Sequence, residues 1–317
     1  MNISIIIPIY NGGKYLDILL KNINKQIDST CEVILIDDCS EDDSRKIISK
    51  YKENSNYKIF YNDSNYGVSY SRNIGLLNAS KKYIVFIDSD DDISEDYFSN
   101  INSLISLDKD LIVFGTRFVY ENRFNDINVN YNEYLSMKDV IDSNILLDIP
   151  MAQWVTNKVF KKDIICDNDL RFNESLKTGE DLEFMLKYFE YVEDIVCIKK
   201  CLYFYNRMNS SSLTRKNIVN IVDSTNNNNM MIERYFMRNS MSIDYLYKYK
   251  TDLFIYVFDT IYKSSLEYKE KIDLFKRNIE KNFFKESEKY CDKTLYDMII
   301  NNDIDNIYKY VEAKWNK

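Results

Sequence analysis

The chain opens with Ile3-Ser4-Ile5-Ile6-Ile7-Pro8-Ile9, a short apolar segment rich in β-branched residues. Three later segments within the first hundred residues share this composition: Glu32–Ile36, Tyr57–Tyr61 and Tyr83–Ile87. Runs of this kind are typical of strands that are buried on both faces of a parallel sheet. We therefore predict that the amino-terminal part of the chain forms such a sheet.

Segments with helical spacing lie between these strands. Apolar stripes with this spacing occur at two sets of positions: Tyr15, Ile18, Leu19 and Ile23, and then Ile47, Ile48 and Tyr51. A third helix is expected from about Val68 to Ala79, after the turn at Asn65-Tyr66-Gly67. Strands and helices that alternate in this way predict right-handed crossovers and an α/β fold with a doubly wound, mostly parallel sheet.

The pattern becomes less regular after the fourth strand. We expect further strands at Leu111–Phe118 and Ile195–Tyr205, a helix around Met137–Leu147 and another from about Glu180. The polar, Asn-rich segment Arg123–Tyr134 is expected to be a loop or an irregular insertion.

From about Asn217 the sequence changes to long helical patterns rich in Tyr, Phe, Lys and Asn. We therefore predict two domains, residues 1–215 with the sheet and residues 216–317 as an all-helical region. The low-complexity run Asn226-Asn227-Asn228-Asn229 is expected to be a loop within this region.

The composition excludes several classes of site. The 317 residues include no histidine, which removes serine–histidine and cysteine–histidine catalysis and histidine zinc sites. A net charge of -8 argues against a protein that binds nucleic acid. The 6 cysteines are scattered, and we see no export signal and no apolar run long enough to span a bilayer. We therefore expect reduced thiols and a cytoplasmic protein.

Two acidic clusters follow predicted strands. Asp37 and Asp38 end the second strand, and Asp88-Ser89-Asp90-Asp91-Asp92 ends the fourth. Ligands of open parallel sheets bind at the carboxyl ends of the strands, and carboxylate ligands without His or Cys suit Mg²⁺ or Mn²⁺. An Asp-x-Asp pair that holds such an ion leaves positions open for a diphosphate. For each cluster alone the alternative stays open that its members are helix caps and solvated turn residues.

A series of motifs runs along about the first 210 residues. The early motifs are Ser4–Asn11 with Tyr15-Leu16, Val33–Ser44, Asn65–Ser69 with Arg72–Gly75, and Phe86–Asp91. The later motifs are Trp154, Asn157–Phe160, Arg171-Phe172 and Gly179–Phe184. In content and order they resemble family 2 glycosyltransferases of the GT-A fold, in particular the inverting enzymes of bacterial surface polysaccharides. The carboxyl-terminal third carries no such resemblance.

The resemblance implies a nucleotide-sugar site and a metal ion. Nucleotide-sugar binding is assigned to these positions: Pro8, Tyr10, Asn11, Asp38, Arg72, Asp88, Ser89 and Asp90. Asp38 would accept a hydrogen bond from the base, and Asp90 with Asp88 would hold Mn²⁺ or Mg²⁺. Asp91 and Asp92 receive no firm role.

The resemblance also implies sugar transfer by a single displacement at the anomeric carbon. Asp181 would take the proton of the acceptor hydroxyl as general base, while the metal offsets the charge of the leaving nucleoside diphosphate. Glu180 would substitute for Asp181 or cap the helix that follows. An alternative stays open, in which both are first-turn carboxylates that the helix dipole favours.

On the acceptor side, Trp154 is expected to stack on a sugar, with core packing as the alternative. The stretch Tyr205-Asn206-Arg207 with Ser210-Ser211-Ser212 resembles the end of the GT-A domain and would contact the diphosphate or cover the donor. The helical region is expected to contribute a peripheral membrane contact or a homodimer interface.

The function implied is transfer of a sugar, from a UDP-sugar in preference, to a hydroxyl of a glycan or lipid-linked oligosaccharide. The product would belong to a capsule, a lipopolysaccharide or an exopolysaccharide, made in the cytoplasm or at the inner face of the membrane. Two alternatives remain. One is a non-catalytic partner with the same fold in a polysaccharide synthase complex, and the other is a haloacid dehalogenase-like phosphatase with Asp88 as nucleophile.

Overall fold

The computed structural model describes residues 1–131, 133–176, 178–208 and 218–315. The chain divides into two compact units, Met1–Asn209 and Ser210–Lys317. The predicted domain boundary, between residues 215 and 216, lies outside the described residues.

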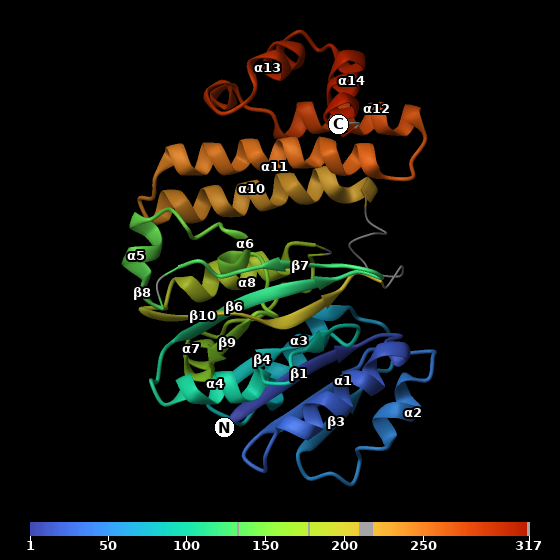
Figure 1. Ribbon diagram of the computed structural model, residues 1–317, viewed down its shortest axis with the longest axis vertical. Coiled ribbons are helices and arrows are strands. Elements are labelled where there is room, and N and C mark those ends of the chain that lie inside the picture. The colour runs from blue at the N-terminus through green and yellow to red at the C-terminus, as the bar shows by residue number, and fades with distance from the viewer. Residues whose placement is uncertain (132, 177, 209–217, 316–317) are drawn as a thin grey trace. The chain divides into compact units, whose positions relative to one another are not determined.

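The first unit is built on one mixed sheet (Figure 1). Its described strands are β1 (Ile3–Ile9), β2 (Glu32–Asp37), β3 (Tyr57–Tyr61), β4 (Tyr83–Phe86), β5 (Asp92–Ile93), β6 (Leu111–Val119), β7 (Phe124–Ile127), β8 (Tyr134–Ser136), β9 (Lys158–Lys161) and β10 (Asp194–Asn206). Its described helices are α1 (Gly13–Gln26), α2 (Ser44–Ser49), α3 (Val68–Asn78), α4 (Tyr97–Ile105), α5 (Met137–Asp142), α6 (Ile149–Ala152), α7 (Lys162–Asp167) and α8 (Glu180–Phe189).

The strand order is β3-β2-β1-β4-β9-β6-β10-β5, with β7 paired to β6 and β8 to β10. Neighbours from β3 to β4 are parallel, and β9 runs antiparallel to both β4 and β6. The four early strands that the sequence predicts are confirmed, each within one residue at either end. In register, Ile9 of β1 lies opposite Asp37, and Ile6 lies opposite Phe86. The carboxyl ends of β1, β2 and β4 therefore meet at one edge of the sheet.

The expectation of a loop or irregular insertion over Arg123–Tyr134 is wrong for Phe124–Ile127 and for Tyr134, which form strands. The segment contains β7 and the first residue of β8. β7 is a polar strand that pairs only with β6, and its Asp126 carboxylate binds Arg117 with an Nε–Oδ1 distance of 2.7 Å. A strand at the margin of a sheet does not need an apolar run, so composition alone gives no signal for it. The helix expected around Met137–Leu147 forms but ends at Asp142.

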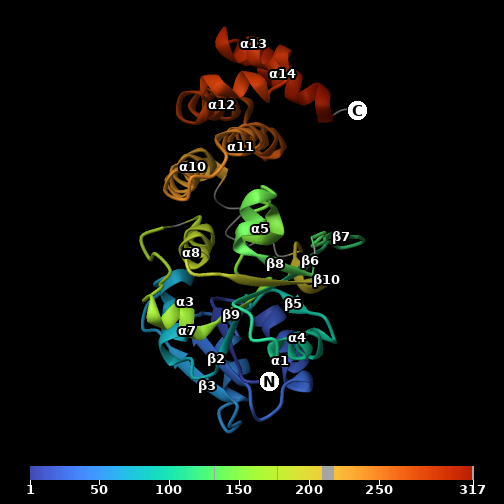
Figure 2. The ribbon, with the colours of Figure 1, turned by 90° about the vertical axis from the view of Figure 1, so that its left-hand side faces the viewer.

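The alternating side chains of β1 pack on two different helix layers. Ile3, Ile5 and Ile7 lie in a core with side chains of α1 and α4, and Ile6 points to the opposite face, where α3 lies. Figure 2 shows α1 and α4 on one side of the sheet and α3 on the other. A Cβ atom on Gly75 of α3 would lie 2.3 Å from Cγ2 of Ile6, so glycine allows α3 to approach the strand this closely.

Aromatic rings fill the space between the sheet and α8. Phe86 of β4 contacts Phe160, Phe172 and Phe184, and the Phe172 and Phe184 rings stack at 4.2 Å. Ring pairs in this arrangement add stability beyond the burial of their area. The cluster fixes the face of α8 against the strands.

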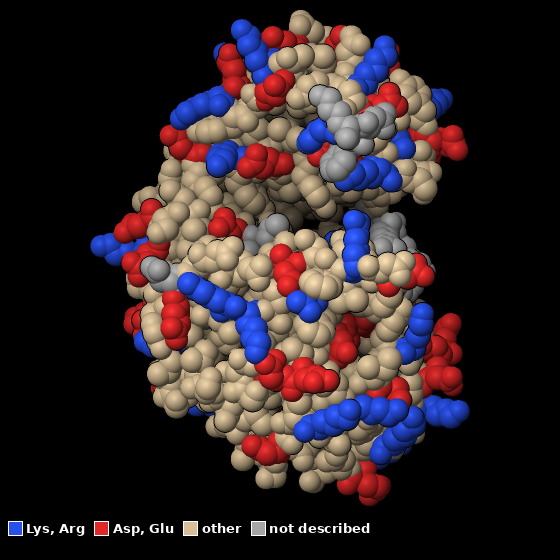
Figure 3. Space-filling model, viewed as in Figure 1, with Lys and Arg blue, Asp and Glu red and all other residues tan. Residues whose placement is uncertain are grey.

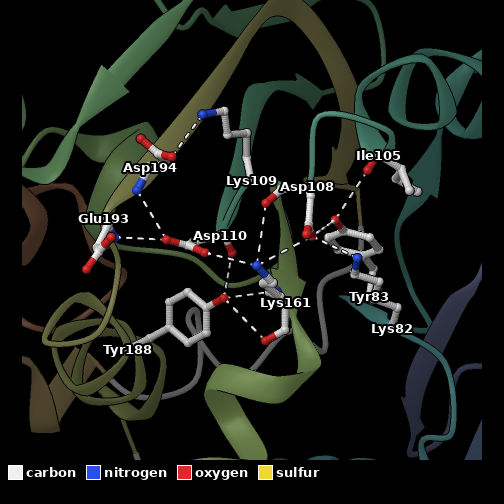
Figure 4. Close-up of polar contacts among 10 residues, drawn as sticks. All are labelled: Lys82, Tyr83, Ile105, Asp108, Lys109, Asp110, Lys161, Tyr188, Glu193 and Asp194. Carbon is white, nitrogen blue, oxygen red and sulfur yellow. Dashed lines mark hydrogen bonds and ion pairs between the residues drawn. The ribbon is translucent and has the colours of Figure 1, made fainter.

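A polar network holds the carboxyl-terminal end of α8 (Figure 4). The Tyr188 hydroxyl donates to the carbonyl of Asp110 at 2.6 Å and accepts from the amide of Lys161 at 2.9 Å. The Asp110 carboxylate in turn accepts the amides of Glu193 and Asp194 at 3.0 and 3.2 Å. Because α8 is fixed at this end, the direction in which its first turn points is fixed as well.

The second unit is all-helical, as predicted. Its described helices are α10 (Ile221–Arg238), α11 (Ile243–Lys263), α12 (Tyr268–Asn282), α13 (Lys293–Ile300) and α14 (Ile304–Trp315), with short 3₁₀ turns η1 (Ile218–Asn220) and η2 (Lys285–Lys289). Buried side chains from these helices, including Phe254, Phe258 and Phe275, form a separate core. None of the described helices in either unit is both long and apolar enough to cross a membrane.

The expectation of a loop at Asn226–Asn229 is wrong, because these residues lie in the middle of α10. Val222, Asn229 and Ile232 are buried on one face of this helix, at helical spacing. Packing of that face against the neighbouring helices outweighs the poor helix propensity of asparagine.

Charged side chains of both signs are interspersed over the face of the molecule that Figure 3 shows. Lys and Arg alternate with Asp and Glu there, and no broad area of one sign is visible on that face. A surface of this kind exerts little long-range attraction on a charged partner.

Candidate active site

Most of the predicted donor-site residues lie at the carboxyl ends of β1, β2 and β4. Asp37 ends β2 and Asp38 follows it, while Asp88 comes two residues after the end of β4. A Cβ atom on Gly12, just beyond β1, would lie 2.7 Å from the Ser89 hydroxyl. The loop after β1 and the loop after β4 are therefore in contact, as the parallel order of the strands requires.

Asp38 is a buried carboxylate that holds the turn before α3. It accepts hydrogen bonds from Nδ2 of Asn62 at 2.7 Å and from the amides of Tyr66 and Gly67 at 3.0 and 2.7 Å. Gly67 has a φ of 94°, in the left-handed region that glycine enters without strain. The contact of Asp38 with a base stays a prediction. Asp37 is a structural partner, bound by Nε of Arg45 at 2.6 Å.

Tyr10 and Asn11 follow β1, in which Pro8 is buried and pairs with β2. The Tyr10 side chain is 51% exposed, so its ring is accessible at the strand end. Asn11 donates its amide to Ser40 at 3.0 Å and accepts the amide of Glu41 at 2.9 Å. These bonds tie the loop after β1 to the loop after β2.

Arg72 lies at the centre of the candidate site. Its Nη1 atom lies 2.6 Å from Oδ1 of Asp181, and its Nη2 atom lies 2.9 Å from Oδ1 of Asp88. Glu180 is farther away, at 3.8 Å, and the guanidinium lies over the Phe172 ring at 5.2 Å from its centroid. The side chain is only 3% exposed. Burial lowers the pKa of Arg72, but the three carboxylates outweigh burial and raise it, so the group is cationic.

Asp181 and Glu180 form the first turn of α8. Oδ2 of Asp181 accepts the amide of Val155 at 3.4 Å. Burial raises the pKa of Asp181, and Asp88 raises it further, while Arg72 opposes the shift. Burial and the adjacent Asp181 charge raise the pKa of Glu180 to about 7. Carboxyl groups with raised pKa values in a partly exposed site suit proton transfer near neutral pH.

The loop that carries the Asp-x-Asp motif has one buried acid and two accessible ones. Asp91 is 3% exposed, and it accepts the Tyr203 hydroxyl at 2.5 Å and the Asn206 amide at 2.8 Å. Burial, together with the charges of Asp90 and Asp88, raises the pKa of Asp91 well above its usual value. Asp91 is therefore a structural acid. Asp88 and Asp90 are partly exposed.

The donor atoms at this loop fit a divalent cation of the magnesium type. No group of three or more acidic or cysteine side chains in the described residues is arranged to hold a metal ion by itself. Mg²⁺ and Mn²⁺ sites in nucleotide enzymes use one or two carboxylates together with substrate phosphates and water. Asp88 and Asp90 could supply oxygen ligands of that kind, and the metal ion stays a prediction.

Trp154 belongs to an aromatic group at the carboxyl ends of β6 and β10. Its ring meets Phe118 edge-on at 5.6 Å, and Phe118 meets Tyr205 at 5.3 Å. The Arg207 guanidinium lies about 5 Å from the centroids of Phe118 (5.1 Å) and Tyr205 (5.0 Å). Trp154 is half-buried, so both stacking on a sugar and core packing stay predictions. Ser210–Ser212 lie outside the described residues.

Sequence reasoning assigned no role to Lys158, which is fully buried in β9. Its Nζ donates to the carbonyl of Trp154 and to Oδ1 of Asn157. Burial lowers the pKa of Lys158 to about 7, against the attraction of Asp181. The available signal was a lysine directly before Val159 and Phe160, because a lysine that is buried with such apolar neighbours needs polar partners.

Comparisons with known proteins identify the family of the chain. The model of the family "Glycosyl transferase family 2" matches residues 4–167. The chain is 28% identical over 209 residues to the poly(ribitol-phosphate) β-N-acetylglucosaminyltransferase TarS of Staphylococcus aureus, covering 65% of this chain and 35% of TarS. It is 26% identical over 223 residues to glycosyltransferase GlyG of Streptococcus pneumoniae, covering 66% of this chain and 72% of GlyG.

The fold of the whole chain also has a counterpart. A crystal structure of residues 1–349 of S. aureus TarS in complex with UDP-GlcNAc matches with a TM-score of 0.71 and 20% sequence identity, covering 100% of this chain and 92% of that one. The likeness confirms the predicted GT-A architecture with a helical carboxyl-terminal region. The family model covers more than half of the chain, which therefore belongs to glycosyl transferase family 2.

Proposed function

We propose that the protein is a glycosyltransferase that moves a sugar from a UDP-sugar to a hydroxyl of a bacterial surface glycan. The observation that carries this proposal is the chain of contacts Asp88–Arg72–Asp181, at 2.9 and 2.6 Å. The side chain of Arg72 thereby connects the Asp-x-Asp loop directly to Asp181, a carboxyl group with a raised pKa. Donor binding and proton removal would thus take place side by side.

Asp181 would act as the general base. An acceptor hydroxyl within hydrogen-bond distance of its carboxylate would lose its proton as the new glycosidic bond forms. Arg72 holds the carboxylate in place, and its charge opposes the rise in the pKa of Asp181 that burial causes. Glu180, whose pKa is raised to about 7, would be a neighbouring acid that titrates near neutral pH.

Asp88 and Asp90 would hold Mn²⁺ or Mg²⁺ together with the donor diphosphate. The ion, when bound, supplies positive charge that offsets the charge of the leaving nucleoside diphosphate. Tyr10 would cover the nucleoside with its exposed ring, and Asp38 would fix the floor of the pocket beneath it.

The relatives support the substrate class. The TarS crystal structure contains UDP-GlcNAc, and the curated relatives include enzymes named for poly(ribitol-phosphate) and for teichoic acid. We therefore propose an N-acetylhexosamine or hexose donor linked to UDP, and an acceptor that is a surface glycan or polyol phosphate. The chain spans about a third (35%) of the length of TarS, so the acceptor of TarS does not transfer directly to this protein.

The test compares transfer and binding in one variant. Asp181→Asn keeps the size of the side chain but removes the base, so UDP-sugar turnover should fall by about 100-fold or more while UDP affinity stays within about threefold. Glu32→Gln is the matched control, because Glu32 is a buried, salt-bridged carboxylate at the opposite edge of the sheet. Full turnover in Asp181→Asn would contradict the proposed base, and absence of UDP binding in the unaltered protein would contradict the proposed donor.

A further inference from the structure

β10 reaches the donor loop through the side chain of Tyr203 and through the backbone amide and side chain of Asn206. Tyr203 is fully buried, and its hydroxyl donates to Oδ2 of Asp91 at 2.5 Å while accepting the amide of Asp88 at 3.2 Å. The Asn206 amide donates to Oδ1 of Asp91 at 2.8 Å, and its Nδ2 donates to the carbonyl of Asp90 at 3.0 Å. Four hydrogen bonds thus join the strand to three residues of the loop.

These contacts provide hydrogen-bond partners for the amide of Asp88, the carbonyl of Asp90 and the carboxylate of Asp91, which lie in a loop. The loop follows the last residue of β4, Phe86, and its backbone turns at Asp91, whose amide donates to the carbonyl of Asp88 at 3.2 Å. β10 pairs with β5 only at Tyr203 and Phe204, directly beside this turn. A buried carboxylate with hydrogen-bond donors on both oxygens is expensive to release, so the turn is held firmly.

The direction of the Tyr203 side chain depends on an irregularity in β10. The register between β10 and β6 shifts between Ile198 and Cys201 and again between Cys201 and Tyr203. Bulges of this kind change the direction of the side chains that follow them. Tyr203 follows both shifts directly, and the pairing with β6 is regular from Tyr203 to Asn206.

We propose that Tyr203 and Asn206 are positioning residues that hold Asp88 and Asp90 in the arrangement that binds the donor diphosphate, acting through Asp91 and the loop backbone. The inference rests on the proposed function, since it concerns how the donor loop of that site is held. It assigns Asp91 to support of the loop and not to metal binding. It also makes the carboxyl-terminal end of β10 part of the donor site.

The experiment uses Tyr203→Phe in the full chain, which removes one oxygen atom and leaves the ring in place. Tyr97→Phe is the matched control, because Tyr97 is equally buried in the same core and its hydroxyl has no hydrogen-bond partner in the described structure. Calorimetry should show that Tyr203→Phe weakens binding of UDP with Mn²⁺ by about tenfold, the factor that corresponds to loss of one hydrogen bond to a charged group. Tyr97→Phe should leave the affinity unchanged.

A second readout needs no ligand. Hydrogen exchange of the Asp88 amide should become about tenfold faster in Tyr203→Phe, because that amide loses its acceptor, while the amides of β4 keep their rates. Asn206→Ala, at a partly exposed position, should weaken binding of UDP with Mn²⁺ in the same direction, and it decides the matter if Tyr203→Phe does not fold.

Equal affinity and equal exchange in Tyr203→Phe and Tyr97→Phe would overturn the inference. A loss of melting temperature in Tyr203→Phe with unchanged UDP affinity would also overturn it, because that result describes a purely structural residue. If the unaltered protein bound no nucleoside diphosphate, the proposed function would fail instead, and the exchange of the Asp88 amide would still show whether Tyr203 holds the loop.

Discussion

Carboxyl groups near the two ends of the parallel strands in the first unit differ in the direction of their pKa shifts. At the amino ends of the strands, burial raises the pKa of Glu32, but hydrogen bonds from Lys58, Ser4 and Ser80 outweigh it and lower the pKa to about 2. At the carboxyl ends, the pKa of Glu180 is raised to about 7. At the amino ends, hydrogen bonds therefore stabilise the ionised form of Glu32. At the carboxyl ends, Glu180 titrates near neutral pH.

This difference distinguishes charged groups that stabilise the fold from groups whose pKa values suit proton transfer. Asp108, an exposed carboxylate in the loop before β6, also has a pKa lowered to about 2, chiefly by the hydrogen bond from Lys82. Asp181, with a raised pKa, and Lys158, with its pKa lowered to about 7, follow the pattern of Glu180. Carboxyl and amino groups with perturbed pKa values gather at functional sites, so this distribution supports the proposal that the donor and acceptor bind at the carboxyl ends of the strands.

Removal of Arg72 should have the largest effect. Arg72→Met leaves Asp88 and Asp181 without their shared cation, which should cost about 3–5 kcal/mol of stability and lower turnover by about 100-fold or more. Urea unfolding and a turnover assay at pH 7 measure the two effects. Arg72→Lys should recover part of both. A stable and active Arg72→Met variant would contradict this account, because it would show that Asp88 and Asp181 do not need the Arg72 cation.

Glu32→Gln should affect stability alone. The ionised carboxylate stabilises the fold above the unfolded pKa of about 4.5, and this contribution is lost as the pH falls toward the folded pKa of about 2. Unfolding at pH 7 should therefore show a loss of about 2–3 kcal/mol, and the difference from the unaltered protein should shrink between pH 4.5 and pH 2. Turnover of the folded variant should be unchanged. A selective loss of turnover would mean that the amino ends of the strands take part in the reaction.

Gly75→Ala tests whether the packing of α3 against β1 affects the candidate active site. The new methyl group would overlap Ile6 and push α3, which carries Arg72, away from β1. We expect a loss of about 1–3 kcal/mol together with reduced turnover, measured by thermal unfolding and by the same assay. Ile6→Ala in the same chain should restore part of both by making room. If stability falls but turnover is kept, the position of α3 does not set the geometry of Arg72.

Glu180→Gln should produce the smallest change, with a pH signature. Because the folded pKa is raised to about 7, ionisation of Glu180 costs stability as the pH rises from the unfolded value of 4.5 through 7. The variant lacks this cost, so its stability relative to the unaltered protein should improve by about 1 kcal/mol or more between pH 5 and pH 8. Equilibrium unfolding at these two pH values measures the change. A constant difference would show that Glu180 has an ordinary pKa.

Apolar runs and acidic strand ends allowed much of this molecule to be predicted. Ile3–Ile9 was located correctly because its continuous apolar, β-branched run is typical of a strand buried on both faces, and Tyr57–Tyr61 was located correctly from its β-branched and aromatic residues. The contact of Arg72 with Asp181 was not predicted, since 109 residues separate the two and only the fold brings them together. The burial of Asp91 was equally hidden, because its partners lie at the end of a strand more than a hundred residues later.

Predictions from local composition were wrong where contacts with neighbouring strands or helices determine the secondary structure. β7 is polar and was taken for a loop, because its hydrogen bonds to β6 need no apolar side chains. The run Asn226–Asn229 is helical since one buried face of α10 supplies the free energy that asparagine lacks. Family resemblance supplied the roles of the site residues, and those roles remain predictions for Asp38, Asp90, Trp154 and Asp181.

The most direct test of the central claim maps where the donor binds. Hydrogen exchange of the unaltered protein, with and without UDP and Mn²⁺, compares the amides that follow β1, β2 and β4 with those that precede the same strands. We predict slower exchange at residues 10–12 and 88–91 and unchanged exchange at residues 30–32 and 80–83. Protection at the amino ends, or none at the carboxyl ends under saturating UDP, would contradict the proposal that the donor binds at the carboxyl ends.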